Sequence, residues 1–195
     1  MNLSRRSQAE IAMAISFVIL GLTAGGNAQA KKPSWVVAWA SSMAGLAPDT
    51  TLSNATIRMV ARPSIGGESI RIRLENTFGT VPVTIGAASV ALRARLSGLV
   101  AGSSVPLTFG GAPSVTIPAG GKIVSDEAKF RVEAWQDIAV DLYVPGSNVP
   151  VTRHNAAQTT SYMTANDAGN HAGGGDNTVF AQTTTAMYFL SSVEV

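Results

Sequence analysis

Two histidines, His154 and His171, are the side chains of this sequence best suited to move a proton at neutral pH. A serine hydrolase would need one of them as a base, beside a serine nucleophile and an orienting acid. The G-x-S-x-G turn that presents such a serine in many hydrolases does not occur in the sequence. His171 stands in a glycine-rich segment, NDAGNHAGGGDNT at 166–178, four residues after Asp167. Because such a loop gives a base no fixed geometry, we do not expect His171 to be catalytic.

Arg153 and His154 are the candidate interface or ligand residues of the chain. They lie in the segment TRHNAAQTTSY at 152–162, between two expected strands. One interpretation is structural, with His154 hydrogen bonded so that it pins the end of a strand. The other is functional, with the pair in contact with a neighbouring domain or a ligand. The sequence leaves both open.

The sequence contains few residues that could bind a metal ion or a cofactor. The sequence has no cysteine, which excludes a thiol nucleophile, a thiolate metal site and disulfide bonds. A metal site needs several ligands that converge, and the two histidines and scattered acids lack such spacing. Asp126 and Glu127 are adjacent, and neighbours along a strand point to opposite faces, so they do not form an acid–base pair. We expect no metal and no cofactor.

Sugar binding would require exposed aromatic rings. The chain contains three tryptophans, Trp35, Trp39 and Trp135. Trp35 and Trp39 have even spacing in one apolar strand, which predicts that both face the same way, into the core. Aromatic residues make up only 6% of the chain, so core packing is the favoured interpretation.

The elements that must position these residues are strands. SIRIRLE at 69–75 alternates apolar and charged residues, which is typical of a half-buried antiparallel strand. KFRVE at 129–133 and DIAVDLYV at 137–144 repeat this alternation. Glycine and proline turns separate the strands, and no segment after residue 30 has a sustained helical period. The pattern predicts an all-β, antiparallel β-sandwich or jelly roll. Further strands are expected at 35–41, 56–61, 88–93, 105–109 and 113–117.

The first thirty residues have the order of a secretory signal peptide. Arg5 and Arg6 precede an apolar run at 11–24, and the small residues Ala28 and Ala30 suit a cleavage site. The run is shorter than the roughly 20 residues that span a bilayer, which disfavours the alternative of a membrane anchor. We therefore expect a secreted or periplasmic protein with no membrane span after signal cleavage.

Charge argues against a nucleic-acid partner. The formal net charge of the chain is +2, and it falls to about +1 without residues 1–30. The arginines of RIRL and RARL alternate with apolar residues and form no cationic cluster of the kind that binds phosphates.

Several longer motifs resemble the N-terminal region of secreted bacterial SGNH/GDSL-family esterases. They are WVVAWASS, RPSIGGESIRIRLENTFG, LTFGG followed by VTIPAG and SD, TRHNAAQTTSY, and the final MYFLSSVEV. The resemblance covers nearly all of the chain after the signal. It implies a β-sandwich that precedes a catalytic α/β domain. Residues 31–186 would then be the accessory domain, and residues 187–195 the strand that leads into a catalytic domain missing from this chain.

The catalytic motifs of that family do not occur here. The sequence has neither a Gly-Asp-Ser block nor an Asp-x-x-His block. Two residues also depart from the family pattern: Glu75 stands where serine is usual, and Trp135 stands in a turn where small residues are usual.

Three functions are therefore to be weighed. The first is a non-catalytic accessory domain of a truncated or split SGNH/GDSL ester hydrolase, which packs on a catalytic domain supplied in trans and meets an ester or carbohydrate substrate through it. The second is a stand-alone carbohydrate- or cell-envelope-binding module. The third is a hydrolase in its own right, which needs a Ser–His–Asp cluster. An accessory domain parted from its partner should expose apolar surface, and we expect Tyr188, Phe189 and Leu190 to contribute it.

Overall fold

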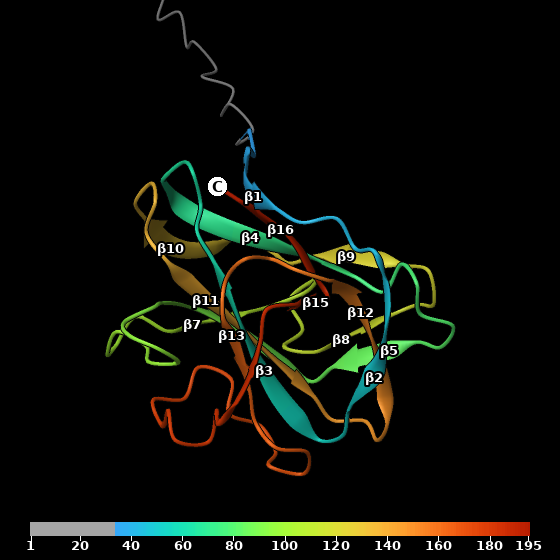
Figure 1. Cartoon of the computed structure of the whole chain (residues 1–195). Helices are drawn as coiled ribbons and strands as arrows, with labels where there is room; N and C mark the ends of the chain where they lie inside the picture. Colours follow the sequence, from blue (N-terminus) through green and yellow to red (C-terminus); the bar gives the residue numbers. More distant parts are fainter. Residues whose placement is uncertain (1–33) are drawn as a thin grey trace, which may run out of the picture. The chain divides into compact units, whose positions relative to one another are not determined.

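The computed structural model describes residues 34–195, and the expected signal peptide at 1–30 lies outside this part. The described residues contain sixteen strands and no helix, so no helix there is long enough to cross a membrane. All strand pairs are antiparallel, which confirms the predicted all-β sandwich (Figure 1). The strands are β1 (Val37–Ala40), β2 (Gly45–Leu52), β3 (Ala55–Ala61), β4 (Gly67–Glu75), β5 (Val83–Ile85), β6 (Ala87–Leu92), β7 (Val105–Leu107), β8 (Val115–Ile117), β9 (Lys122–Val124), β10 (Ala128–Val132), β11 (Ile138–Val144), β12 (Val149–His154), β13 (Ser161–Met163), β14 (Gln182–Thr184), β15 (Met187–Tyr188) and β16 (Leu190–Glu194).

The largest sheet has the order β14-β13-β3-β11-β6-β7. Its central strands, β3 and β11, pair without a register shift along their whole length, from Ile138 opposite Ala61 to Val144 opposite Ala55. All seven residues of β3 are buried, because the strand is covered on both faces. β3 and β11 therefore form the buried centre of this sheet.

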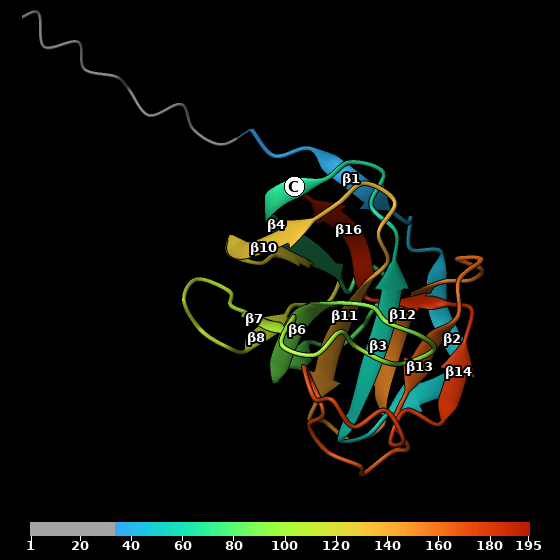
Figure 2. The same cartoon turned by 90° about the vertical axis from the view of Figure 1, so that its left-hand side faces the viewer.

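The second sheet has the order β1-β16-β4-β10, with β9 also paired to β4. Figure 2 shows its strands above those of the six-stranded sheet. In β4, Ile70, Ile72 and Leu74 are fully buried, whereas the intervening Arg71 and Arg73 are half-exposed. The alternation predicted from SIRIRLE is therefore confirmed. One face of this sheet joins the core, and the other carries charged side chains.

Residues 187–194 connect a small sheet, β15-β12-β2, to the second large sheet. The switch occurs at Phe189, whose φ of 58° lies in the left-handed region that non-glycine residues rarely adopt. Its amide donates to the carbonyl of Thr152, and its own carbonyl accepts from the amide of Glu75. This one residue therefore hydrogen bonds to strands of both sheets.

The expected exposure of the terminal strand is wrong. Tyr188 is 3% exposed, and Phe189 and Leu190 are fully buried. β16 is an inner strand, paired with β1 on one side and β4 on the other. Apolar residues in an inner strand of a sandwich pack in the core, and residues 187–194 belong to the same compact unit as the strands before them.

Candidate functional site

The side of β1, β16 and β4 that faces away from the core carries a cluster of charged side chains, here called the outer face. At its centre is Glu194 of β16, which is only 3% exposed. Arg71 Nε lies 2.6 Å from Glu194 Oε2, and Arg73 Nη2 lies 3.0 Å from Glu194 Oε1. Antiparallel pairing puts Glu194 opposite Arg71, so the strand register itself brings the carboxylate to the two arginines.

The guanidinium groups of Arg71 and Arg73 stabilise the ionised form of Glu194. Burial raises the pKa of its carboxyl group. The hydrogen bonds and positive charges of Arg73 and Arg71 together lower the pKa by more than burial raises it, so the net shift is downward. The carboxylate is therefore held ionised at neutral pH. With two arginines and one glutamate, the cluster carries one excess positive charge, and its arginine side chains are 29% and 32% exposed.

Trp35 belongs to this outer face, not to the core. Its ring lies under the guanidinium carbon of Arg71, 4.5 Å from the ring centre to that carbon. Trp39, by contrast, packs against the core. The prediction that both tryptophans face the core is wrong for Trp35, because the pairing of β1 with β16 shifts register between Val37 and Trp39. Such a bulge breaks the strict alternation on which the prediction depended.

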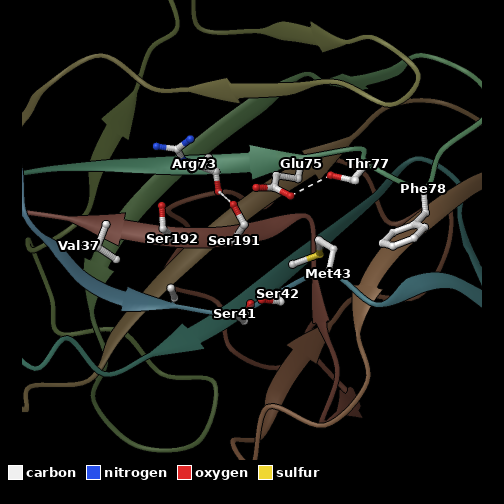
Figure 3. A pocket seen from close by; sticks show the side chains of 11 residues that line it. Val37, Ser41, Ser42, Met43, Arg73, Glu75, Thr77, Phe78, Ser191 and Ser192 are labelled. Atoms are coloured by element: carbon white, nitrogen blue, oxygen red, sulfur yellow. Dashed lines mark hydrogen bonds between the residues drawn. The ribbon is translucent and has the colours of Figure 1, made fainter.

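A pocket of about 360 Å³ lies beside the charged cluster (Figure 3). Glu75 closes one side and accepts a 2.8 Å hydrogen bond from the hydroxyl of Thr77. Val37 and Phe78 leave 53% and 44% of their surface exposed at its margin. The side chains and backbone that line the pocket come from Val37, Ala40, Ser41, Ser42, Met43, Arg73, Glu75, Thr77, Phe78, Ser191 and Ser192.

The structure places Arg153 and His154 behind one wall of this pocket. His154 Nδ1 lies 2.8 Å from the carbonyl oxygen of Ser42, and since a carbonyl only accepts, the imidazole proton is on Nδ1. The carbonyl of Arg153 accepts a 2.7 Å hydrogen bond from the amide of Ala44. The end of β12 therefore holds residues 41–44, three of which line the pocket. Both residues act on the pocket through the backbone of this segment.

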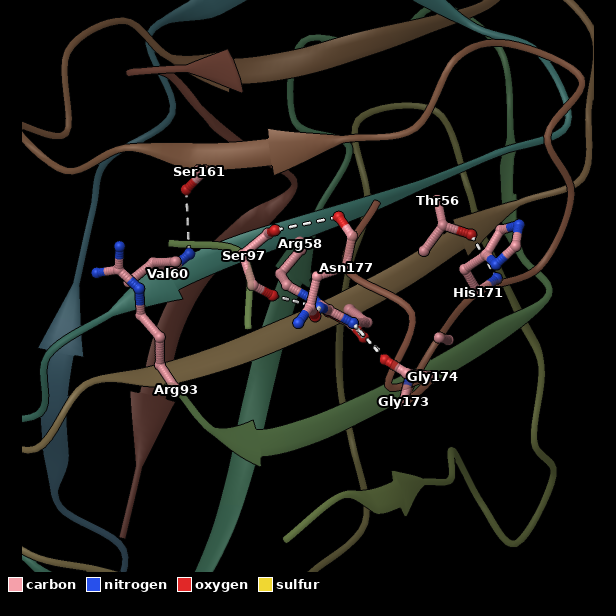
Figure 4. Close-up of polar contacts among 12 residues, drawn as sticks. Thr56, Arg58, Val60, Arg93, Ser97, Ser161, His171, Gly173, Gly174 and Asn177 are labelled. Carbon is pink, nitrogen blue, oxygen red and sulfur yellow. Dashed lines mark hydrogen bonds and ion pairs between the residues drawn. The ribbon is translucent and has the colours of Figure 1, made fainter. Parts of the chain in front are cut away.

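His171 lies at a different place, in the loop between β13 and β14. Its Nε2 is 3.0 Å from the carbonyl oxygen of Ala168, and its amide donates to the hydroxyl of Thr56 (Figure 4). Within residues 34–195, neither imidazole is hydrogen bonded to a serine hydroxyl or to a carboxylate. Among residues 34–195, no nucleophile, base and acid come together around either histidine.

A buried ion pair that was not predicted from the sequence fixes the loop that contains His171. Arg58 of β3 and Asp141 of β11 are each 1% exposed, and Arg58 Nε lies 2.7 Å from Asp141 Oδ1. The amide of Gly173 donates to Asp141 Oδ2, and Arg58 donates to the carbonyl of Gly174 (Figure 4). The ring of Phe180 covers the guanidinium at 4.0 Å. The sequence signal for this pair is that β3 and β11 each contain one charged residue. A charge in a buried strand is stable only when it is paired with an opposite charge.

Within the described residues, no group of three or more histidine and acidic side chains is placed to hold a metal ion. Asp126, one of the two adjacent acids, instead accepts hydrogen bonds from the amides of Gly110 and Gly111 and from the hydroxyl of Thr108. These contacts fix the 109–112 turn and lower the pKa of the Asp126 carboxyl group.

Comparison with models of known protein families finds no match to this chain. A search of curated proteins also finds no match.

Proposed function

We propose that residues 34–195 form a non-catalytic accessory domain of a secreted or periplasmic SGNH/GDSL-type ester hydrolase, and that the outer face packs on the catalytic domain. The observation that carries the proposal is the nearly buried Glu194 between two half-exposed arginines, next to a pocket bordered by exposed Val37 and Phe78. The substrate, an ester or an acylated carbohydrate, would be met through the catalytic partner.

The chemistry of the outer face suits a protein partner. Interfaces join an apolar centre to a polar rim, and exposed apolar groups that gather beside fixed charges are typical of such surfaces. Val37 of the edge strand β1, which pairs with Glu194, is 53% exposed. The arginine side chains are already ordered by Glu194, so a partner would lose little conformational freedom on binding them.

Arg153 and His154 have a supporting role in this proposal. They hold the backbone of residues 41–44, and this segment forms one wall of the pocket on the outer face. The structural and the functional interpretation of His154 then agree, since the residue pins a strand end and so shapes the contact surface. It would touch the partner only through the residues it positions.

The sequence motifs support the proposed class of partner, an SGNH/GDSL-type catalytic domain. The resemblance to the N-terminal region of SGNH/GDSL esterases covers nearly all of the described part of the chain, and the catalytic blocks of that family are not in it. In addition, both imidazoles are engaged with backbone carbonyls. The nucleophile, base and acid would therefore belong to the partner.

The test is a binding measurement. Residues 31–195 are mixed with the catalytic domain of a secreted bacterial SGNH/GDSL esterase, prepared without its own sandwich and verified as folded by its ester hydrolysis. We expect a one-to-one complex in calorimetry. Val37→Asp, which puts a charge at the exposed margin of the outer-face pocket, should weaken the complex at least ~10-fold.

Val100→Asp is the matched control, because Val100 is 43% exposed and lies in the turn after β6, away from the outer face. It should bind as tightly as the unchanged chain. The proposal fails if no complex forms, or if the two aspartate variants weaken it equally.

A further inference from the structure

A second pocket, of about 460 Å³, shares no lining residue with the pocket on the outer face and is lined mainly by polar groups. Its centre is Asp137, which two arginines share. Arg62 Nε lies 2.6 Å from Asp137 Oδ1, and Arg93 Nη1 lies 3.1 Å from Asp137 Oδ2. Arg93 also donates to the hydroxyl oxygen of Tyr162. Three consecutive polar residues, 158–160, form another part of the wall.

The pocket carries an excess positive charge. The hydrogen bond from Arg62 is the main cause that lowers the pKa of Asp137, and this carboxylate is ionised at neutral pH. It balances only one of the two arginines. The side chain of Arg62 is 61% exposed, so its remaining N–H groups are available to an acceptor from solution. A carboxylate on a ligand would satisfy them.

An exposed tryptophan lies in the turn that leads into Asp137, although it does not itself line the pocket. Trp135 is 69% exposed, the highest value among the large apolar side chains of the described residues. Its amide donates to the carbonyl of Pro63 at 2.7 Å, which fixes it beside Arg62, and Asp137 follows it by two residues. Its φ of 66° is a conformation that bulky residues rarely adopt, and such backbone gathers at ligand-binding sites.

These features together point to a saccharide. A sugar ring offers an apolar face that stacks on an exposed aromatic ring, and hydroxyls that need donors and acceptors together. The pocket supplies both kinds from Asp137, Tyr162 and residues 158–160. We propose that Trp135 and the Arg62–Asp137–Arg93 pocket bind an oligosaccharide that carries uronic acid groups. This site goes beyond the accessory role proposed above and is independent of it.

Calorimetric titration of residues 31–195 with trigalacturonate, and with neutral cellotriose of equal length, tests the proposal. Trigalacturonate should bind at least ~10-fold more tightly than cellotriose. Trp135→Ala should weaken both by about 10-fold or more, because the stacking surface is lost. Arg62→Gln should weaken only trigalacturonate and bring its affinity close to that of cellotriose.

Two control variants separate this site from general surface effects. Phe78→Ala removes an exposed ring on the outer face, and Arg131→Gln removes an exposed arginine that does not line the pocket. Both should bind trigalacturonate as the unchanged chain does, and thermal melts verify that every variant is folded.

The proposal is overturned if neither saccharide binds at millimolar concentration, if cellotriose binds as tightly as trigalacturonate, or if Trp135→Ala and Arg62→Gln leave binding unchanged. Because Trp135→Ala leaves the outer face intact, it should still bind the catalytic domain.

Discussion

Two arginine–carboxylate clusters of similar geometry lie in different surroundings in this protein. In the first, Arg58 and Asp141 join neighbouring strands, β3 and β11, and both side chains are 1% exposed. In the second, Arg71 and Arg73 of β4 hold Glu194 of β16, and the arginines are 29% and 32% exposed. The hydrogen bonds have nearly the same length in both clusters. The two clusters differ in the residues that cover them and in the exposed fraction of their arginine side chains.

The buried cluster is closed by its own chain. Phe180 covers the guanidinium of Arg58, and Gly173, Gly174 and Ser97 form further hydrogen bonds with the pair. In the cluster of the outer face, Trp35 lies against Arg71 and Glu194 is buried, but the two arginine side chains remain 29% and 32% exposed. We therefore expect the first cluster to maintain the fold, and we propose that the second meets a partner. Substitutions should separate these two roles.

The largest effect is expected for Asp141→Asn. It leaves the charge of Arg58 buried without a counter-ion, and loss of one member of such a pair costs about 3–5 kcal/mol in free energy of unfolding. Denaturant titration measures this cost, and hydrogen exchange in residues 166–178 should rise, because the loop loses its anchor. A loss below 1 kcal/mol would mean that the pair does not hold the fold.

A smaller effect is expected for Glu194→Gln. This change removes charged hydrogen bonds worth about 1–3 kcal/mol when fully desolvated, and the partly exposed arginines place the loss near the lower end. It should weaken binding of the catalytic domain more than it lowers stability. An equal or larger loss of stability than in Asp141→Asn would remove the distinction between the two clusters.

The pH dependence sharpens this second prediction. The folded-state pKa of Glu194 is lower than its ordinary value of 4.5, so folding favours the ionised form. The resulting stabilisation is present above pH 4.5 and is lost as the pH falls through the folded-state value. Glu194→Gln should therefore show a flatter stability curve on acidification than the unchanged chain, with the two curves converging at low pH.

Much of the fold follows from the sequence because strands with one buried face leave a simple pattern. In β4 and β10 the apolar residues predicted to face inward, such as Ile72 and Phe130, are buried. The pattern failed where the backbone departs from regular pairing. A bulge moves Trp35 to the outer face, and the left-handed backbone at Phe189 takes the chain from one sheet to another.

The candidate site was harder to predict. Arg153 and His154 do not line the pocket; they contact the backbone of residues 42–44, more than a hundred residues earlier in the chain, of which Ser42 and Met43 line it. The contacts of Glu194 and Asp137 likewise depend on which strands pair and in what register. Sequence patterns report which face of a strand is buried, and they do not report which charged residues from distant strands meet there.

The most direct test of the central claim is hydrolysis of a short-chain activated ester by purified residues 31–195, beside a blank protein that has no serine nucleophile. The account predicts a rate equal to that of the blank, with ester hydrolysis appearing only when an SGNH/GDSL catalytic domain is added. A clear rate from the chain alone, abolished by His154→Ala, would contradict it, because the nucleophile and base would then belong to this domain.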